Sequence, residues 1–206
     1  MVPSSSKENI LNKIRQALVQ PVPLPFPENL PDQNIFAPPT DPLDIIFAEA
    51  FINLQGKFIF CDDDQDMQSK LQHLINTRVW MKIYCENTIW NPIFSNTINL
   101  ETCDAAITNC ELLVARTGSI ILSSAQQQGR TVSVYAPVHI CIAYTNQLVY
   151  DIKDALEAIS KNYGDNIPSL ISFASGPSRT ADIEKTLVTG VHGPKEVYLF
   201  LVDITA

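Results

Sequence analysis

The sequence predicts an α/β fold in which a parallel-to-mixed β-sheet is flanked by helices. Short apolar runs typical of buried strands alternate with amphipathic helical stretches, and this strand–helix–strand succession favours parallel strands joined by right-handed crossovers. The chain has 206 residues, 46% of them hydrophobic. That is enough for one well-buried core and too little for two independent ones.

Residues 1–39 predict an N-terminal helical arm that is distinct from the α/β domain of residues 40–206. Apolar residues recur at helical spacing from Ile10 to Leu18, and prolines then alternate with other residues over 21–27, which holds the backbone near polyproline II. We therefore expect an amphipathic helix of about four turns on a stiff arm. It either packs on its own domain or docks on a second copy or a partner.

The first part of the α/β domain alternates helix and strand. We expect a helix from Pro42 to a C-cap at Gly56, a strand over 57–61, a helix after the acidic run 62–66, and a strand over 79–85. The acidic run suits a helix start, where the dipole favours carboxylates. A calcium loop beginning at Asp62 would need glycine at Met67 and glutamate at His73, so the EF-hand interpretation fails.

The second part is richer in strands. Two strands within residues 107–124 are expected to meet at the tight turn Thr117-Gly118-Ser119, where Gly118 takes the strained backbone position. Further strands are expected over 132–135, 140–144, 170–174 and 197–202, with a helix over 148–163 that Asn146 caps at the start and Gly164 at the end.

Composition excludes several classes of function. A net charge of −8 argues against nonspecific binding to nucleic acid or anionic lipid. No apolar run approaches the ~18–20 residues of a membrane helix, and the N-terminus lacks the apolar stretch of a signal peptide, so we expect a soluble, cytoplasmic protein. The cysteines lack metal-site spacing and are expected to be reduced, buried thiols: Cys61, Cys85, Cys103, Cys110 and Cys141.

The stretch from Leu170 to Pro194 predicts a binding loop. A short apolar strand ends in a Gly-Pro turn, and Thr180 is expected to cap a following helix with an acidic first turn, which would leave backbone N–H groups free for an anion. Arg179 adds a planar guanidinium suited to carboxylate or phosphate. The alternative is a plain strand-to-helix connection with Arg179 in solvent.

Several short blocks, in a fixed order, carry a family resemblance. They are Thr117-Gly118-Ser119, Gly129-Arg130, Pro137-Val138-His139, the stretch 175–184 and the stretch 190–194. With these blocks the chain resembles the lactate utilization protein C family, also called the LUD domain family. The resemblance implies a Rossmann-like sheet similar to the sugar-phosphate isomerase and coenzyme A transferase fold. It also implies a cytoplasmic part in the oxidation of L-lactate to pyruvate, alongside two iron–sulfur proteins.

The resemblance also shapes the expected cofactors and site. Because this chain has no ferredoxin-type cysteine set, we expect no cofactor in it and iron–sulfur clusters on its partner proteins. Ligands of open α/β sheets settle at the carboxyl ends of strands, so a small 2-hydroxy or 2-keto acid is expected there. Arg179 would take its carboxylate in two parallel hydrogen bonds. The predicted substrate-binding residues are Thr117, Gly118, Ser119, Ser175, Gly176, Ser178, Arg179 and Thr180.

Two residues are predicted as catalytic, His192 and Asp182. His192 lies on a glycine- and proline-rich loop and could move protons near neutral pH, unless it only hydrogen-bonds its own loop. Asp182 could orient His192 or pair with Arg179, unless it only complements a helix dipole. His139 has the same chemistry, but Pro137 and the strand that follows favour a structural role. A Ser-His-Asp triad lacks the G-x-S-x-G elbow.

Three functions stay open. The leading one is a non-iron–sulfur component of an L-lactate utilization system that binds a small organic anion or assists complex assembly. The second is a stand-alone enzyme acting on a carboxylate, phosphosugar or thioester through His192 and Arg179. The third is a structural adaptor whose N-terminal arm docks iron–sulfur partners; the same arm could form a homo-oligomer.

Overall fold

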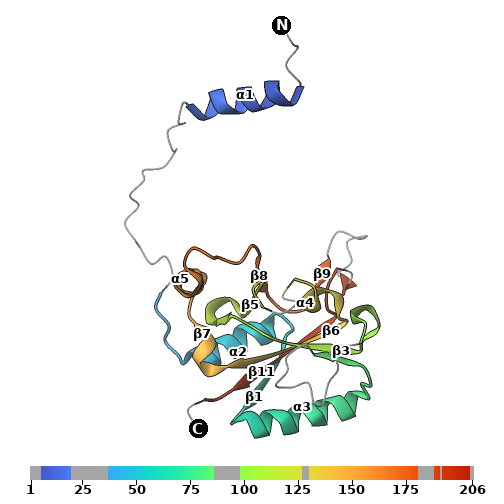
Figure 1. Cartoon of the computed structure of the whole chain (residues 1–206). Helices are drawn as coiled ribbons and strands as arrows, with labels where there is room; N and C mark the ends of the chain where they lie inside the picture. Colours follow the sequence, from blue (N-terminus) through green and yellow to red (C-terminus); the bar gives the residue numbers. More distant parts are fainter. Residues whose placement is uncertain are drawn as a thin grey trace. The chain divides into compact units, whose positions relative to one another are not determined.

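The structure is a computed structural model that describes residues 6–19, 37–85, 98–126, 130–180, 188–190 and 192–204. Its contacts divide the chain into two units, Met1–Pro38 and Pro39–Ala206. The first unit contains α1 (Ser6–Val19), which confirms the predicted N-terminal helix. The proline-rich segment 21–27 lies outside the described residues. The second unit contains the remaining elements (Figure 1).

Five parallel strands form the main sheet, in the order β1-β11-β6-β3-β2. They are β1 (Lys57–Cys61), β2 (Ile83–Cys85), β3 (Ala105–Asn109), β6 (Val138–Tyr144) and β11 (Glu196–Val202). The central strands β6 and β11 are buried along nearly their whole length, which is why consecutive apolar residues fill them. The predicted parallel arrangement is confirmed.

Alternate residues of the central strands serve two different apolar cores. Ile140 and Ile142 of β6 pack with residues of α3 (Asp64–Arg78) on one face of the sheet. Cys141 and Ala143 pack with residues of α2 (Leu43–Asn53) on the other face. The two-residue period of the pleat produces this division. The main sheet is therefore covered on both sides, as expected for an α/β fold.

A second sheet of four strands packs over the α2 face. Its order is β7-β4-β5-β8, with β4 (Leu112–Val114), β5 (Ser119–Ser123), β7 (Leu148–Val149) and β8 (Ile171–Ala174). β5 is antiparallel to both of its neighbours, whereas β7 is parallel to β4. Leu113 and Ile120 face the core that includes α2 and the main sheet. Val114 and Ile121 pack against α5 (Ile152–Tyr163) instead, so α5 forms the outer layer.

The remaining elements are short. They are α4 (Val132–Tyr135), the antiparallel pair β9 (Arg179–Thr180) and β10 (Val188–Thr189), and the 3₁₀ turns η1 (Leu100–Thr102), η2 (Ala115–Thr117) and η3 (Thr145–Gln147). Within the described ranges, no helix combines the length and the apolar character needed to cross a membrane.

The acidic run starts α3, as the sequence predicts. Asp63 is the N-cap, and its carboxylate accepts the backbone N–H of Asp66 at 2.7 Å. Asp66 then forms an ion pair with Lys70 one turn later, at 2.6 Å. Carboxylates in the first turn offset the positive end of the helix dipole, which explains their position without a metal.

The turn between β4 and β5 is also as predicted at Gly118. Its φ is +59°, and a Cβ atom there would lie 2.6 Å from the backbone nitrogen of Phe51 in α2. Glycine is therefore required both for the left-handed backbone and for close packing on α2. The first strand of the predicted pair is wrong in part, because Ile107 to Asn109 belong to β3 of the main sheet.

The strand predicted over 79–85 is too long, because β2 spans only Ile83–Cys85. Val79 instead takes the left-handed conformation, with φ +55°, as the C-cap of α3. The backbone N–H groups of Met81 and Lys82 then donate to the Asp104 carboxylate, both at 2.8 Å. The Asp104 side chain thus accepts the backbone hydrogen bonds that a neighbouring strand would otherwise accept.

Three more expectations are wrong, and a fourth lies partly outside the described residues. Val132–Tyr135 form α4 rather than a strand. α5 begins at Ile152 with Asp151 as its N-cap, not Asn146, although it ends at Gly164 as predicted. α2 ends at Asn53 with Leu54 as its C-cap, and Gly56 lies beyond that cap. Thr180, the expected cap of a helix, lies in β9 and pairs with Val188; residues 181–187, where that helix was expected, are outside the described part.

Candidate functional site

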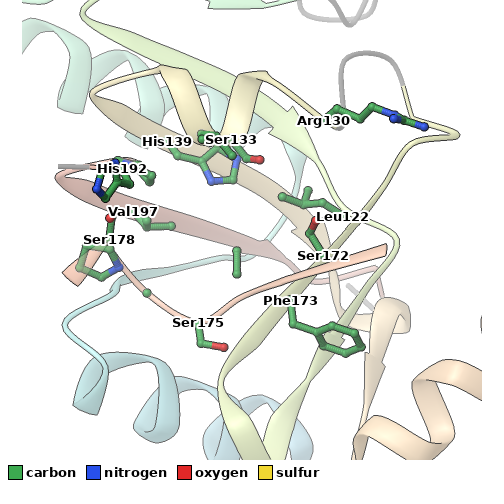
Figure 2. Close-up of a pocket in the computed structure, with 16 residues that line it drawn as sticks. Leu122, Arg130, Ser133, His139, Ser172, Phe173, Ser175, Ser178, His192 and Val197 are labelled. Atoms are coloured by element: carbon green, nitrogen blue, oxygen red, sulfur yellow. The ribbon is translucent and has the colours of Figure 1, made fainter. Parts of the chain in front are cut away.

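A pocket of about 310 Å³ lies where loops of both sheets meet (Figure 2). One wall is the end of β8 with the loop that follows it, residues 172–178. The others are α4 with the preceding Arg130, the loop 192–194, and single residues from three strands, Leu122, His139 and Val197. Elements far apart in the sequence therefore build one concave site, as ligand pockets in α/β domains commonly are.

The pocket lies at the amino ends of two parallel strands. His139 is the second residue of β6, and Val197 is the second residue of β11. The expected place for a ligand was the carboxyl end of the parallel strands, which is the opposite edge of the main sheet. The loop 175–178 does follow the carboxyl end of a strand, but that strand is β8 of the second sheet.

Backbone hydrogen bonds join the two glycine-containing loops into one wall. The N–H of Ser178 donates to the carbonyl of Pro194, and the N–H of Gly190 donates to the carbonyl of Ser178, both at 2.9 Å. A Cβ on Gly193 would lie 3.0 Å from the Ser178 Cβ. The loops thus need small residues where they meet, which explains why the sequence pairs two glycine blocks at this spacing.

Gly176 fixes the turn that leads into this wall. Its φ is +81°, and a Cβ there would lie 2.5 Å from the carbonyl oxygen of Leu54 at the end of α2. A side chain would clash with backbone that cannot rotate away, so only glycine fits. Pro177, the next residue, is buried.

A chain of hydroxyls ties the β4–β5 turn to the same loop. Thr117 Oγ1 lies 2.8 Å from Ser119 Oγ, which lies 2.7 Å from Ser175 Oγ. Ser119 is buried, whereas Ser175 is exposed and lines the pocket. The turn therefore supports Ser175 from behind and does not itself face the pocket.

His139 is buried at the inner side of the pocket. Its exposed fraction is 0%, and burial lowers its pKa to about 4. Nε2 lies 2.7 Å from Thr108 Oγ1 on the neighbouring strand β3. Nδ1 is also buried and has no hydrogen-bond partner among the described residues. Buried polar atoms are normally paired, so this nitrogen is an exception that needs an explanation.

The polar lining consists of basic side chains and hydroxyls. Arg130 and His192 are exposed and contribute a cation and a group that becomes one on protonation. The guanidinium of Arg130 also donates to the Ser169 hydroxyl. Hydroxyls come from four serines, and no Asp or Glu is found among the lining residues that the structure describes: the serines are Ser133, Ser172, Ser175 and Ser178.

A second depression of about 440 Å³ adjoins the pocket. It shares Val134, His192 and Gly193 with the first and adds the cation of Lys195. His192 therefore stands between two hollows, both of which carry positive charge nearby. A ligand larger than a three-carbon acid would have room in the second.

The predicted site residues divide into three groups. Ser175, Gly176, Ser178 and His192 line the pocket. Thr117 and Ser119 support it from behind, and Gly118 packs on α2. Arg179 is exposed on β9 and is not among the lining residues. Thr180 pairs through its backbone in β9, and Asp182 lies outside the described residues.

Sequence reasoning missed Arg130, Ser133 and Ser172 as lining residues and favoured a structural role for His139. A signal was present, since Gly129-Arg130 and Pro137-Val138-His139 are among the blocks that carry the family resemblance. Treating every block as part of one site would have found Arg130 and His139. Ser172, inside a strand, carries no such signal.

The cysteines have the character of structural thiols. All five are buried and free. Burial raises the pKa of Cys61 to about 11, and a hydrogen bond with Cys141 together with burial raises that of Cys110. Protonated thiols are poor metal ligands. In the described ranges, no group of three or more His, Cys, Asp or Glu side chains is placed to hold a metal ion.

Comparison with known proteins identifies relatives. Residues 82–202 match the model of the LUD domain. The chain is 31% identical over 153 residues to lactate utilization protein C of Geobacillus kaustophilus, covering 72% of this chain and 63% of that protein. It is 37% identical over 106 residues to lactate utilization protein C of Bacillus subtilis, covering 50% and 44%. An uncharacterized protein of Neisseria meningitidis is 34% identical over 99 residues, covering 48% and 42%.

These alignments span about half the length of the curated relatives. The crystal structure of a DUF162 family protein from Deinococcus radiodurans has the same fold, with a TM-score of 0.57 and 19% identity, and covers 78% of this chain and 96% of that one. The predicted family is confirmed, because the domain match covers more than half of the sequence. The chain belongs to the LUD domain family.

Proposed function

We propose that this chain is a non-iron–sulfur component of an L-lactate utilization system and that it binds a small organic anion in the pocket of Figure 2. The relatives' name, lactate utilization protein C, supports the system. The pocket supports the binding role. A volume of about 310 Å³ lies at the small end of ligand sites and suits a three-carbon acid.

The observation that carries the proposal is the polar lining of this pocket. Four serines, Arg130 and His192 line it, and no Asp or Glu is among the described lining residues. A carboxylate that enters would meet a guanidinium, which can bind it in two parallel hydrogen bonds. Hydroxyls can donate to its remaining lone pairs. Arg130 here takes the part that the sequence gave to Arg179.

Oxidation of lactate also needs an electron acceptor, and the scattered, buried thiols of this chain are not suited to hold a cluster. We place the clusters on iron–sulfur partner proteins in the cytoplasm. The apolar stripe of α1, with Ile10, Leu11 and Ile14 exposed, is the surface we propose for docking a partner or a second copy.

The test is a titration of the intact chain with L-lactate and pyruvate, with the neutral lactamide as control ligand. We expect Arg130→Gln to lower affinity for the acids roughly ten- to a hundredfold, because a hydrogen bond to a charged group contributes about 1.5–3 kcal/mol. The matched variant Arg179→Gln changes an exposed guanidinium that does not line the pocket, and we expect it to leave affinity unchanged.

Two results would contradict the proposal. The first is that neither acid binds the intact chain, and the second is that the Arg179 variant loses affinity while the Arg130 variant does not. The second result would return the site to the loop that the sequence favoured. Growth on lactate should follow the same order of variants as affinity does.

A stand-alone enzyme is the second candidate, and the depression beside His192 favours it. That hollow of about 440 Å³ with Lys195 at its wall leaves space for a phosphosugar or thioester next to an exposed imidazole. Turnover by the purified chain alone, lost in His192→Gln, would support the enzyme over the subunit. A pure adaptor role would leave growth on lactate intact in Arg130→Gln.

A further inference from the structure

We propose that His139 contacts the ligand directly, and that its Nδ1–H donates to a ligand carbonyl oxygen. The pocket would then select small 2-oxo acids over the matched 2-hydroxy acids. This inference rests on the anion pocket proposed above and names the class of acid that the pocket prefers.

The position of His139 is the first observation. The residue projects from the amino end of β6 toward the space that the pocket residues surround (Figure 2). Its imidazole is fully buried, yet Nδ1 has no hydrogen-bond partner among the described residues. A buried donor without an acceptor is destabilising, so a ligand that supplies the acceptor gains affinity.

The partner of Nε2 fixes which nitrogen carries the proton. Thr108 Oγ1 lies 2.7 Å from Nε2, and the structure gives this hydroxyl no other hydrogen-bond partner among the described residues. If the imidazole donated here, the Thr108 hydroxyl hydrogen would have no acceptor among the described residues, and Nδ1 would be a buried acceptor without a donor. We therefore assign Thr108 as the donor and Nε2 as the acceptor, which leaves fewer polar groups unpaired. The proton of the neutral ring then sits on Nδ1, because neutral imidazole has one donor and one acceptor.

The charge of the ring supports the same assignment. Burial keeps His139 neutral, with a pKa of about 4, so at neutral pH Nδ1 acts as a hydrogen-bond donor without a charge. A carbonyl oxygen only accepts, and it matches this donor. A hydroxyl brings a hydrogen of its own, which needs an acceptor in turn.

The remaining groups suit the other end of a 2-oxo acid. Arg130, His192 and the hydroxyl of Ser175 are accessible to solvent and can take the carboxylate. Because His139 has no exposed surface, a ligand oxygen reaches it only with a small shift of the wall. Ser178 and Gly193, which line the same pocket, are among the smallest residues of that wall.

Two substitutions separate the nitrogens of this ring. Asn places an amide near the position of Nδ1, whereas Gln places one near Nε2. We expect His139→Gln to lose roughly tenfold in pyruvate affinity, the effect of one hydrogen bond. It should also lose any preference for pyruvate over L-lactate. We expect His139→Asn to keep most of the pyruvate affinity and most of this preference.

The experiment combines titration of these variants with nitrogen NMR of the intact wild-type chain labelled at histidine. The chain has three histidines, so His73→Gln and His192→Gln assign the signals even if the His139 variants fail to fold. We expect Nδ1 of His139 to carry hydrogen in the free protein and its resonance to shift on addition of pyruvate.

The outcomes separate the two levels of the proposal. If neither acid binds the wild-type chain, both the anion pocket and the role of His139 are overturned. If pyruvate binds but Nδ1 carries no hydrogen, or its signal ignores the ligand, only the role of His139 is overturned. Equal affinity for pyruvate and L-lactate would likewise reject the selectivity.

Discussion

Burial rather than charge sets the chemistry of His139. The side chain sits in a strand between two others, contacts Thr108 on one of them, and is cut off from solvent. Its pKa falls to about 4, against an ordinary value of 6.5, because the buried site disfavours the charged ring.

This burial makes stability depend on pH. The folded pKa lies below the unfolded one, so between about pH 6.5 and 4 the unfolded chain binds a proton that the folded chain cannot. Stability is thus full above pH 6.5 and falls as pH drops. From pH 7 to pH 5 we expect a loss of about 2 kcal/mol from this residue, measured by denaturant unfolding.

His139→Asn provides the control for this prediction, since it removes the titrating group from the same place. The variant should lose most of the slope between pH 7 and 5. The carboxylates of Asp66 and Asp151, whose pKa values are lowered by Lys70 and Arg116, act below this range. An unchanged slope in the variant would show that His139 is not buried and neutral in solution.

At the residue scale, four of the predicted site residues line the pocket, whereas the arginine that lines it is Arg130 and not the predicted Arg179. The loop residues were recognisable because Gly176 and Gly193 mark close backbone approaches. Arg130 was not, since its place depends on the meeting of α4 with β8, elements that are far apart in the chain. The local sequence pattern carries no information on such a tertiary contact.

The β4–β5 turn shows how a single glycine positions an element. We expect Gly118→Ala to destabilise the protein by more than the strain of about 1–2 kcal/mol for a left-handed residue, because the new Cβ would also meet the backbone of Phe51 at 2.6 Å. Thermal and denaturant unfolding measure the change. Loss of this packing should also weaken the support that Ser119 gives to Ser175.

Val79 has the same left-handed backbone strain as a substituted Gly118 would have, but its side chain is exposed. It is a β-branched residue at φ +55°, and its side chain is 74% exposed at the end of α3. Val79→Gly should therefore stabilise the protein by about 1 kcal/mol. If Gly118→Ala costs no more than Val79→Gly gains, close packing against α2 is not what fixes that glycine.

Elements with a clear apolar period were predictable, and those set by distant contacts were not. The continuous apolar runs of β6 and β11 reflect a sheet that is buried on both faces. The helical spacing of apolar residues in α3 reflects a helix that is buried on one face. α4 looks like a strand in sequence, but only Val132 of its apolar residues is buried, which one helical turn achieves. β9 depends on pairing with β10, which no local pattern reveals.

At the scale of the whole molecule, all described pocket residues belong to the unit Pro39–Ala206. We therefore expect a chain that starts at Thr40 to bind pyruvate with unchanged affinity, because it keeps every lining residue. It should lose association with partners or with a second copy if α1 is the docking element. Calorimetry measures the ligand affinity and light scattering measures the association. A loss of ligand affinity would show that the arm contributes to the site.

The central claim is that the amino ends of β6 and β11, closed by the loops 175–178 and 192–194, receive a small organic anion. The most direct measurement is a map of backbone amide shifts in the nitrogen-labelled intact chain as pyruvate is added. We predict that the largest changes lie in those two loops and at Arg130. Changes centred instead on the carboxyl ends of the same strands, at Tyr144 and Asp203, or no changes at all, would contradict it.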